Sequence, residues 1–328
     1  MKAFVLRSYG SADVLDRTDL DKPVPADDEV LVRVHATSVN PYDWHGMRGE
    51  PYVARLIPGT LGLRGPKLSI LGADVAGQVE AVGKAVTEFR PGDDVFALLE
   101  QGGFAEFVCV PQALLAPKPK NLSYEQAAAV PLAAVTALVA LRDQGRLQPG
   151  QTVLVNGASG GVGTFAVQIA RALGATVTAV CGARNVDLVR SIGADKVIDY
   201  GTTDFTRSGK RYDLLLDIAG SRSASACRRV LTPGGTLVAV GGQAGRWLQP
   251  AGHVAAVLAA GLFASQRIVL ADVVGCTAKK QCLMTLTELI EDGKVTPVID
   301  RRYDFEEIPA AVRYQEEGHA PGKVVVAV

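Results

Sequence analysis

The chain has 328 residues, more than one ordinary globular core needs, so its length predicts two domains and excludes a single small module. It carries 34 Lys and Arg against 34 Asp and Glu, so no net charge attracts it to nucleic acid or to an anionic membrane. With 48% hydrophobic and 21% charged residues, its composition is that of a folded protein rather than a disordered one.

The first third of the chain contains short β-branched and apolar runs that are separated by turn signals. These signals include Pro91-Gly92-Asp93 and Gly102-Gly103. The pattern predicts a compact β-rich domain. Its predicted strands are residues 3–6, 30–39, 71–82, 95–98 and 104–110.

Residues 127–141 are the longest nearly apolar stretch, and they include Pro131 and Thr136. A bilayer span needs roughly 20 apolar residues, so we interpret this stretch as a buried helix. At the N-terminus only four apolar residues precede Arg7, too few for the core of a signal peptide. The five cysteines are scattered without a C-x-x-C pair, which favours reduced thiols over disulfides. We therefore expect a cytoplasmic protein.

After residues 117–119 the pattern changes to an alternation of strands and helices. Helices are predicted over 164–173, which ends at Gly174, and over 186–192, which ends at Gly193. Alternating strands and helices predict an α/β fold with a doubly wound parallel sheet. The predicted strands are residues 152–156, 176–180, 196–199, 214–218, 236–240 and 268–274.

The C-terminal segment has no core of its own, so we expect it to complete the first domain. It is predicted to contain a helix from after Gly275 to about Asp292, a strand at 295–299, a helix at 308–317 and a strand at 324–328. The predicted domains are therefore residues 1–120 with 269–328, and residues 121–268.

The segment 152–163 reads TVLVNGASGGVG and leads from a buried strand directly into a helix. It matches the G-x-G-x-x-G pattern, with Ala158 in the first position, then Gly160 and Gly163. Gly160 would let the backbone approach a pyrophosphate, and Gly163 would let the helix pack on the strand. A tight turn without a ligand is the alternative. The predicted phosphate-binding residues are Ser159, Gly160, Gly161, Val162 and Gly163.

The end of the second parallel strand indicates which dinucleotide binds. An NAD site usually has Asp or Glu there, whereas residues 179–185 read AVCGARN with no acid before Asp187. Gly182 leaves room for a 2′-phosphate and Arg184 can pair with it, so NADPH is predicted. The alternative is that Arg184 is a solvated surface residue.

Further cofactor contacts are expected at residues that follow or face these strands. Tyr200 would border the adenosine, although it could be an ordinary residue at a strand end. Thr136 would bond the nicotinamide or ribose, or else its own helix backbone. Ala219 and Gly241 come directly after the predicted strands 214–218 and 236–240, and complete the predicted cofactor-binding set.

With these motifs, the chain resembles the medium-chain dehydrogenase/reductase superfamily, specifically its zinc-free quinone oxidoreductase branch. The matching segments are SVNPYD at 38–43, GADVAGQVEAVG at 72–83, PGDDVF at 91–96, and residues 127–141 and 156–163. The resemblance implies a GroES-like catalytic domain, a Rossmann domain and an active-site cleft between them. It also implies a homodimer that joins the edges of the Rossmann sheets at 268–274.

The zinc-dependent members of this superfamily provide a test on the residues themselves. Their catalytic zinc ligands are Cys or His at positions that here hold Asn40, Ala73 and, approximately, Leu132. None of these is a usual zinc ligand. The cysteine-rich structural zinc lobe is also missing, because the region after Phe96 contains only Cys109. A site without metal is therefore expected.

Such a site lacks a Lewis acid, so a conjugated acceptor has to spread the developing negative charge itself. The expected reaction is hydride transfer from NADPH to a quinone or another α,β-unsaturated carbonyl. Reduction of a carbon–carbon double bond in an enone or alkenal is an alternative. An alternative from another class is a non-catalytic protein that uses NADPH binding for regulation or for partner binding.

The resemblance places Tyr42, Trp44 and His45 near the nicotinamide. His45 is the first candidate acid, because a histidine pKa of about 6.5 allows it to protonate a reduced oxygen or enolate. The alternative for His45 is a bond to backbone or water, and the alternative for Tyr42 is packing. Trp44 would form a pocket wall. Asp43 is predicted to cap the short helix that follows.

The segment 318–323 reads GHAPGK and contains His319 and Lys323. It could touch the cofactor phosphate, but we favour a surface turn.

Overall fold

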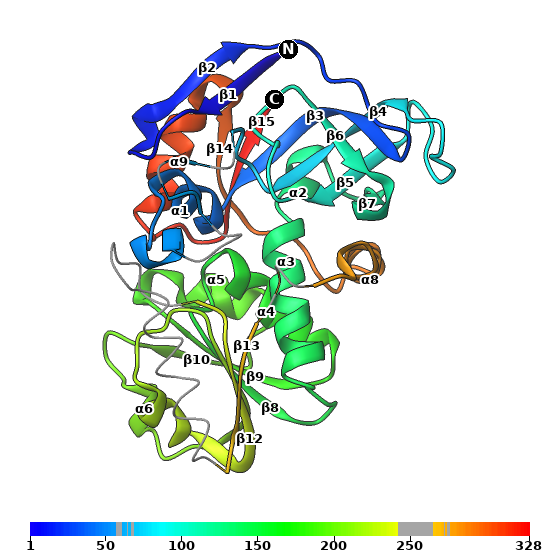
Figure 1. Cartoon of the computed structure of the whole chain (residues 1–328). Coiled ribbons are helices and arrows are strands. Elements are labelled where there is room, and N and C mark those ends of the chain that lie inside the picture. Colours follow the sequence, from blue (N-terminus) through cyan, green and yellow to red (C-terminus); the bar gives the residue numbers. More distant parts are fainter. Residues whose placement is uncertain (57–60, 64, 67–68, 242–264, 272, 274–275) are drawn as a thin grey trace. The chain divides into compact units, whose positions relative to one another are not determined.

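The computed structural model describes all residues except 57–60, 64, 67–68, 242–264, 272 and 274–275 (Figure 1). The chain divides into two compact units. One contains Met1–Leu132, Thr277–Glu291 and Pro297–Val328, and the other contains Ala133–Cys276 and Asp292–Thr296. The prediction that the C-terminal segment completes the first unit agrees with this division, while the predicted domain limits stay a prediction. Among the described residues, no helix is long and apolar enough to cross a membrane.

The first unit, called here the β-rich unit, is built on a seven-stranded sheet with the order β14-β15-β3-β4-β5-β7, in which β6 also pairs with β3. A separate antiparallel pair is formed by β1 (Lys2–Leu6) and β2 (Leu15–Asp19). The strands of the larger sheet are β3 (Glu29–Val39), β4 (Asp74–Val82), β5 (Asp94–Leu98), β6 (Phe107–Pro111), β7 (Leu115–Pro117), β14 (Ile299–Asp304) and β15 (Lys323–Ala327).

Helices cover parts of this sheet, and the unit has two apolar cores, one of which includes residues of α1 and α9. One core lies between β3, β4 and β5 and includes Val32, Val75 and Val95, and the other includes Trp44, Met47 and Val324. Each buried aliphatic side chain contributes roughly 1.5 to 3 kcal/mol relative to an exposed one. The helices are α1 (Pro41–Arg48), α2 (Tyr124–Ala128), α8 (Lys279–Glu291) and α9 (Ile308–Glu316).

The second unit, called here the parallel-sheet unit, contains a six-stranded sheet with the order β10-β9-β8-β11-β12-β13, and every neighbouring pair is parallel. The first strand of the unit, β8, therefore lies in the middle, and the chain winds outward from it in both directions. The strands are β8 (Thr152–Asn156), β9 (Thr176–Cys181), β10 (Lys196–Asp199), β11 (Tyr212–Asp217), β12 (Leu231–Ala239) and β13 (Arg267–Leu270). The helices are α3 (Pro131–Leu138), whose first two residues belong to the β-rich unit, α4 (Gly161–Ala172), α5 (Val186–Ser191) and α6 (Ala224–Arg228). The predicted doubly wound α/β fold is confirmed.

The single helix predicted over 127–141 is wrong. Two helices, α2 and α3, occupy the segment, and a π-helix follows over Val139–Gln144. The break comes at Pro131, which begins α3. Proline has no N–H to donate and its ring clashes with the carbonyl one turn before it, so it cannot continue α2.

The strand predicted over 295–299 is also wrong, because the ordered strand is β14, which begins at Ile299. Pro297 lies inside the predicted run and cannot donate a ladder hydrogen bond. β14 is instead a charged edge strand that pairs in parallel with β15. Backbone pairing with β15 sets the register of β14. The pattern of apolar residues in the sequence does not indicate this pairing. The predicted strand 268–274 begins within β13, and residues 272 and 274 lie outside the described part.

Candidate cofactor edge and active-site residues

The carboxyl edge of the parallel sheet gathers most of the predicted cofactor residues. Because neighbouring strands are parallel, the loops that follow them leave the sheet at the same edge. In sheet order, these loops begin with Tyr200 after β10, Gly182 after β9, Gly157 after β8, Ala219 near the end of β11, and Gly241 near the end of β12. The order of the chain reverses between β8 and β11, which is where doubly wound folds bind ligands.

The glycine loop after β8 has the backbone geometry that a pyrophosphate site needs. Gly157 has a φ of +93°, so the tight turn itself requires a glycine at this position. A Cβ on Gly163 would lie 2.1 Å from the Gly157 carbonyl oxygen, so only glycine allows α4 to pack this closely on the turn. A Cβ on Gly160 would meet nothing nearer than 3.8 Å, so the backbone is open there. The sequence analysis did not identify Gly157 as the turn glycine, because the pattern placed Ala158 in the first position.

The N-terminus of α4 supplies donors at this open backbone. Gly160 precedes the helix, and the first amide that bonds back to it is that of Thr164, with N···O of 2.9 Å. Helix geometry therefore leaves the amides of Gly161, Val162 and Gly163 without an intrahelical acceptor. Free amides and the positive end of the helix dipole favour an anion. The loop fits the pyrophosphate of a dinucleotide.

The loops after β9 and β10 lie against one another. A Cβ on Gly182 would be 3.0 Å from the Tyr200 hydroxyl oxygen, so the phenol lies directly over this glycine. The Tyr200 side chain is 61% exposed, and Arg184 is also exposed. Asn185 donates from Nδ2 to Ser159 Oγ at 3.1 Å and joins this loop to the glycine loop. The structure therefore brings together residues that the sequence analysis assigned to the adenosine side.

A buried amide–carboxylate pair at the centre of this edge was missed by the sequence analysis. Asn156 ends β8 and donates from Nδ2 to Asp217 Oδ1 at 2.7 Å, and both residues are nearly inaccessible. The signal in the sequence was a polar residue that ends each of two apolar strands.

The remaining predicted cofactor residues lie close to the same edge or on α3. A Cβ on Gly157 would lie 3.3 Å from the Ala219 backbone nitrogen, and a Cβ on Gly241 would lie 3.2 Å from the Ile218 carbonyl oxygen. The loops after β8, β11 and β12 are therefore closely packed around the end of β11. Thr136 lies on α3 and is 7% exposed.

In the β-rich unit, α1 carries the two candidate catalytic residues. His45 Nδ1 lies 3.2 Å from the Glu50 carbonyl oxygen, which can only accept, so Nδ1 carries the hydrogen and Nε2 is left as the reactive nitrogen. The imidazole stacks on Trp44 with ring centroids 3.7 Å apart. Burial lowers the pKa of His45, against the opposite effects of the Glu50 carbonyl and the Glu316 charge. The neutral imidazole therefore predominates at neutral pH.

Tyr42 differs from His45 in its surroundings. Its side chain is 36% exposed, and partial burial together with the charges of Glu100 and Asp43 raises the pKa of its phenol. The phenol therefore keeps its proton at neutral pH and can donate a hydrogen bond.

Asp43 takes part in capping α1, as predicted, but it does so as the third helical residue of a capping box and not as the residue that precedes the helix. Asn40 is the residue that precedes α1, and Asp43 lies within the first turn. The Asp43 carboxylate accepts from Asn40 N at 2.8 Å and from Gly72 N at 3.0 Å. Burial raises the pKa of Asp43 to about 7, although both backbone hydrogen bonds oppose the shift.

The surface turn favoured for Lys323 is wrong. Lys323 begins β15 and is 3% exposed, while His319 is exposed. The Lys323 ammonium donates to Asn40 Oδ1 and to Asp74 Oδ2, the second at 3.2 Å. The pairing of β15 with β3 moves this lysine inside, which its place after a glycine–proline segment did not indicate.

Two of the positions that hold zinc ligands in the metal-dependent branch make hydrogen bonds with Lys323 or Asp74. Asn40 is bonded to Lys323, and Leu132 donates its backbone N–H to Asp74 Oδ1 at 2.7 Å. Ala73, the third position, is the neighbour of Asp74. In the described part of the chain, no group of three or more His, Cys, Asp or Glu side chains is arranged to hold a metal ion.

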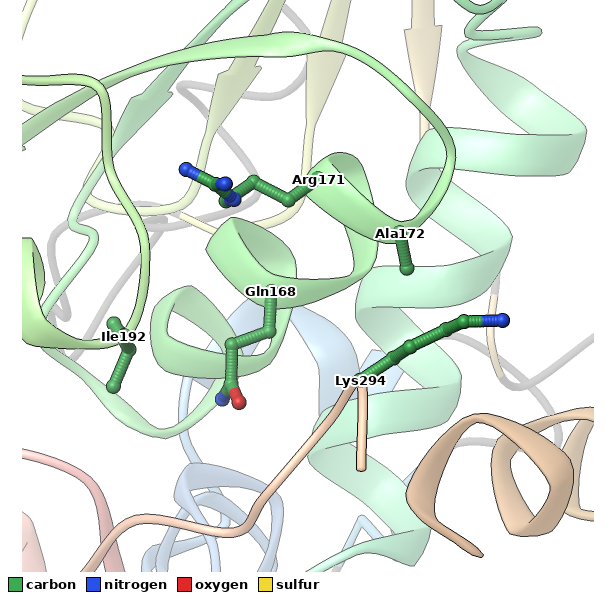
Figure 2. Close-up of a pocket in the computed structure, with 5 residues that line it drawn as sticks. All are labelled: Gln168, Arg171, Ala172, Ile192 and Lys294. Carbon is green, nitrogen blue, oxygen red and sulfur yellow. The ribbon is translucent and has the colours of Figure 1, made fainter. Parts of the chain in front are cut away.

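A hollow of about 340 Å³ lies elsewhere on the parallel-sheet unit, at the C-terminal end of α4 (Figure 2). Its lining includes Arg171 and Ala172 of the last turn of α4, and Lys294. Figure 2 shows the Arg171 and Lys294 side chains pointing in different directions rather than toward one point. Because the glycine loop is at the other end of α4, this hollow is separate from the cofactor edge.

The raised pKa of Asp43 predicts a specific dependence of stability on pH. The folded state binds the Asp43 proton more tightly than the unfolded state, whose pKa is about 3.8. The stability from this proton is complete below that value and is lost as pH rises through about 7. Relative to Asp43→Asn, which carries no titratable group there, the wild type should lose free energy of unfolding across this range. Denaturant unfolding at a series of pH values measures both slopes, and equal slopes would show that Asp43 is already ionised in the folded protein.

Comparison with known proteins assigns the family. Residues 26–120 match the alcohol dehydrogenase GroES-like domain, and residues 192–326 match the zinc-binding dehydrogenase family. The chain is 35% identical to the mitochondrial NAD(P)H oxidoreductase RTN4IP1 of Bos taurus, with 100% of this chain and 89% of that protein covered. It is 33% identical to the chloroplastic NADPH-dependent alkenal/one oxidoreductase of Arabidopsis thaliana, with 99% and 79% covered.

A solved structure agrees with these relatives. The quinone oxidoreductase from Coxiella burnetii superposes with a TM-score of 0.83 at 27% sequence identity, and the match covers 100% of this chain and 99% of that one. The predicted combination of a GroES-like domain and a Rossmann sheet is therefore confirmed. By its sequence relatives and its fold, the chain belongs to the medium-chain dehydrogenase/reductase superfamily, among quinone oxidoreductase and RTN4IP1-like members.

Proposed function

We propose that the protein is an NADPH-dependent oxidoreductase that reduces quinones or other conjugated carbonyl compounds without a metal. The observation that carries the proposal is the open backbone of Gly160 at the N-terminus of α4, on the edge where the strand order reverses. Relatives named as NAD(P)H and NADPH-dependent oxidoreductases support a nicotinamide cofactor.

The proposed cofactor contacts follow the loops along the sheet edge. The amides of Gly161, Val162 and Gly163 would bind the pyrophosphate, with Ser159 and Gly160 beside them. The exposed guanidinium of Arg184 is available for a 2′-phosphate, and no acid stands at Gly182 to select a free ribose hydroxyl. Tyr200, Ala219, Gly241 and Thr136 are proposed to line the rest of the dinucleotide.

The proposed chemistry divides between the cofactor and the side chains of α1. A bound reduced nicotinamide supplies a hydride. The Tyr42 phenol would donate a hydrogen bond to the acceptor oxygen, where negative charge develops. His45 would deliver a proton from Nε2 in its protonated form, which becomes more abundant as pH falls. Because burial lowers the pKa of His45, this form is the minor one at neutral pH.

The zinc-free state is supported by what Asn40 and Asp74 bind. Their oxygens already accept hydrogen bonds from the Lys323 ammonium. A divalent cation bound to the same oxygens would have to displace that buried positive charge. A conjugated acceptor suits such a site because it delocalises charge without a Lewis acid.

A second candidate function is reduction of the carbon–carbon double bond of an enone or alkenal. The 33% identity to the alkenal/one oxidoreductase favours it specifically. The same cofactor and the same proton donor would serve both reactions, with protonation at carbon rather than oxygen.

Dimerisation and cytoplasmic location stay parts of the proposal. Among the described strands, β13 is at one edge of the parallel sheet, so the edge of a second copy could extend the sheet there. Sedimentation of the purified protein would measure the oligomeric state.

The decisive experiment is oxidation of NADPH, and separately of NADH, by chelator-treated protein with quinones, enones, alkenals and simple ketones. Turnover confined to conjugated acceptors with NADPH is expected. Turnover with simple ketones that chelation abolishes would contradict the metal-free proposal. Tight NADPH binding without turnover of any acceptor would favour the non-catalytic, regulatory function.

Arg184→Ala tests the choice of cofactor. The variant should bind NADPH more weakly by about 1.5 to 3 kcal/mol, the range for a hydrogen bond to a charged group, and should bind NADH almost unchanged. Arg190→Ala is the matched control. Arg190 is also an exposed arginine, and it pairs with Asp187 within α5. Both affinities can be measured by nicotinamide fluorescence. An equal loss for the two cofactors would contradict a 2′-phosphate contact.

His45→Phe tests the proton donor, since phenylalanine can keep the stack on Trp44 but has no proton to give. Turnover should fall by about 100-fold, the lower end of general-acid catalysis, and should no longer rise toward acidic pH. His35→Phe is the control, because His35 also stacks on an aromatic ring, Tyr124, and burial also lowers the pKa of its imidazole. A pH–rate profile identical to that of the wild type would remove His45 as the acid.

A further inference from the structure

Three adjacent strands of the β-rich unit bring polar and charged side chains to one buried point. Lys323 begins β15, Asp74 begins β4, and Ser38 lies near the end of β3. β3 runs antiparallel to both neighbours, so the end of β3 meets the starts of β15 and β4 at one edge. Asn40 follows β3 directly and joins them. We call Ser38, Asn40, Asp74 and Lys323 the buried cluster.

The carboxylate of Asp74 is the centre of the buried cluster. Its Oδ2 accepts from Ser38 Oγ at 2.5 Å, from Asn40 Nδ2 at 2.9 Å and from Lys323 Nζ at 3.2 Å. Asp74 is 0% exposed, and a carboxylate without a partner at such a depth is strongly unfavourable. The Lys323 ammonium supplies the compensating charge and reaches it from 249 residues away along the chain.

The buried cluster fixes the residue that precedes α1. The Asn40 amide is held from both sides, since its nitrogen donates to Asp74 and its oxygen accepts from Lys323. The Asn40 backbone N–H is held separately by Asp43 at 2.8 Å. Tyr42 and His45 follow within the next two turns of α1. The position of Asn40 therefore determines where α1 begins and where these two side chains lie.

The other oxygen of Asp74 holds a second helix. Oδ1 accepts from Leu132 N at 2.7 Å, and Leu132 is the second residue of α3. An acceptor at this place satisfies one of the amides that a helix start leaves unpaired. One carboxylate therefore anchors the beginnings of both α1 and α3.

We propose that Asp74 and Lys323 are the positioning residues of the candidate site: the buried carboxylate orients α1 through Asn40, and the ammonium makes that carboxylate tolerable in the interior. Neither side chain needs to touch the acceptor. The inference rests on the proposed function only in assigning Tyr42 and His45 to the reaction. A cluster that only ties strands together would stabilise the protein without orienting these residues.

The double variant Asp74→Asn with Lys323→Met separates orientation from stability. Lys323→Met alone leaves the carboxylate without its countercharge and should lower stability. Replacing both residues removes both charges of the pair and leaves neither one unpartnered, so most of that stability should return. An asparagine can keep one oxygen for Leu132 N, but its amide nitrogen cannot accept from Ser38 and Asn40. The double variant therefore loses the contact that orients α1.

The matched control is Lys280→Met with Glu88→Gln, another lysine–carboxylate pair of the same unit, 2.7 Å apart and with Lys280 19% exposed. Denaturant unfolding, NADPH affinity and quinone turnover are measured for all variants. In the double variant, stability should return, NADPH affinity should match the wild type, and turnover should stay about 100-fold low, as expected for a misplaced catalytic group. Recovery of turnover together with stability would overturn the proposal. The buried cluster would then only stabilise the fold.

Amide hydrogen exchange makes the test independent of the acceptor. Exchange in residues 41–48 should be faster in the double variant than in the wild type and the control, whereas 131–138 should be unchanged. Unchanged exchange over 41–48 would overturn the proposal even if turnover fell. A wild type that reduces no acceptor would contradict the proposed function, and the exchange of 41–48 would still decide whether the buried cluster orients α1.

Discussion

The burial of one negative charge is the constraint on which the β-rich unit depends. Asp74 is 0% exposed, and around it lie the ends of three strands and the beginnings of two helices. A carboxylate in this position requires donors in every direction and a countercharge. Lys323 provides the countercharge from the last strand of the chain, 283 residues after Asn40. The start of the helix that carries the candidate catalytic residues is therefore held in part by the C-terminal strand.

In the parallel-sheet unit, the equivalent constraint is steric. A Cβ on Gly163 would lie 2.1 Å from the carbonyl oxygen of Gly157, so the helix can approach the turn only with glycine at that place. With the helix this close, the first amides of α4 lie next to Gly160, where the backbone is open. The parallel strand order then places the loops of Gly182, Tyr200, Ala219 and Gly241 along the same edge. The placement of the candidate cofactor residues thus depends on the backbone more than on particular side chains.

The two units supply different parts of the proposed chemistry. The sheet edge offers amides, an exposed arginine and a half-exposed tyrosine, which suit a dinucleotide phosphate and adenosine. The α1 segment offers a protonated phenol and a neutral imidazole whose Nε2 is free to exchange a proton. Burial of His45 lowers its pKa, and the Glu50 carbonyl selects its tautomer. The pKa and the tautomer of His45 therefore depend on its neighbours in the folded chain, which the residue types alone do not specify.

The fold class, the cofactor loop and most strands could be predicted from the sequence, because they depend on local patterns of glycine spacing and apolar periodicity. Strands β8 and β10 have the predicted bounds, and Gly163 allows the close packing of helix on turn that was predicted. Local patterns failed where a neighbour in space decides: Pro131 divides a predicted helix, and β14 takes its register from β15. The burial of Lys323 on Asp74 became visible only in the folded chain, because compensation of a buried charge joins residues far apart in the sequence and leaves no periodic signal in it.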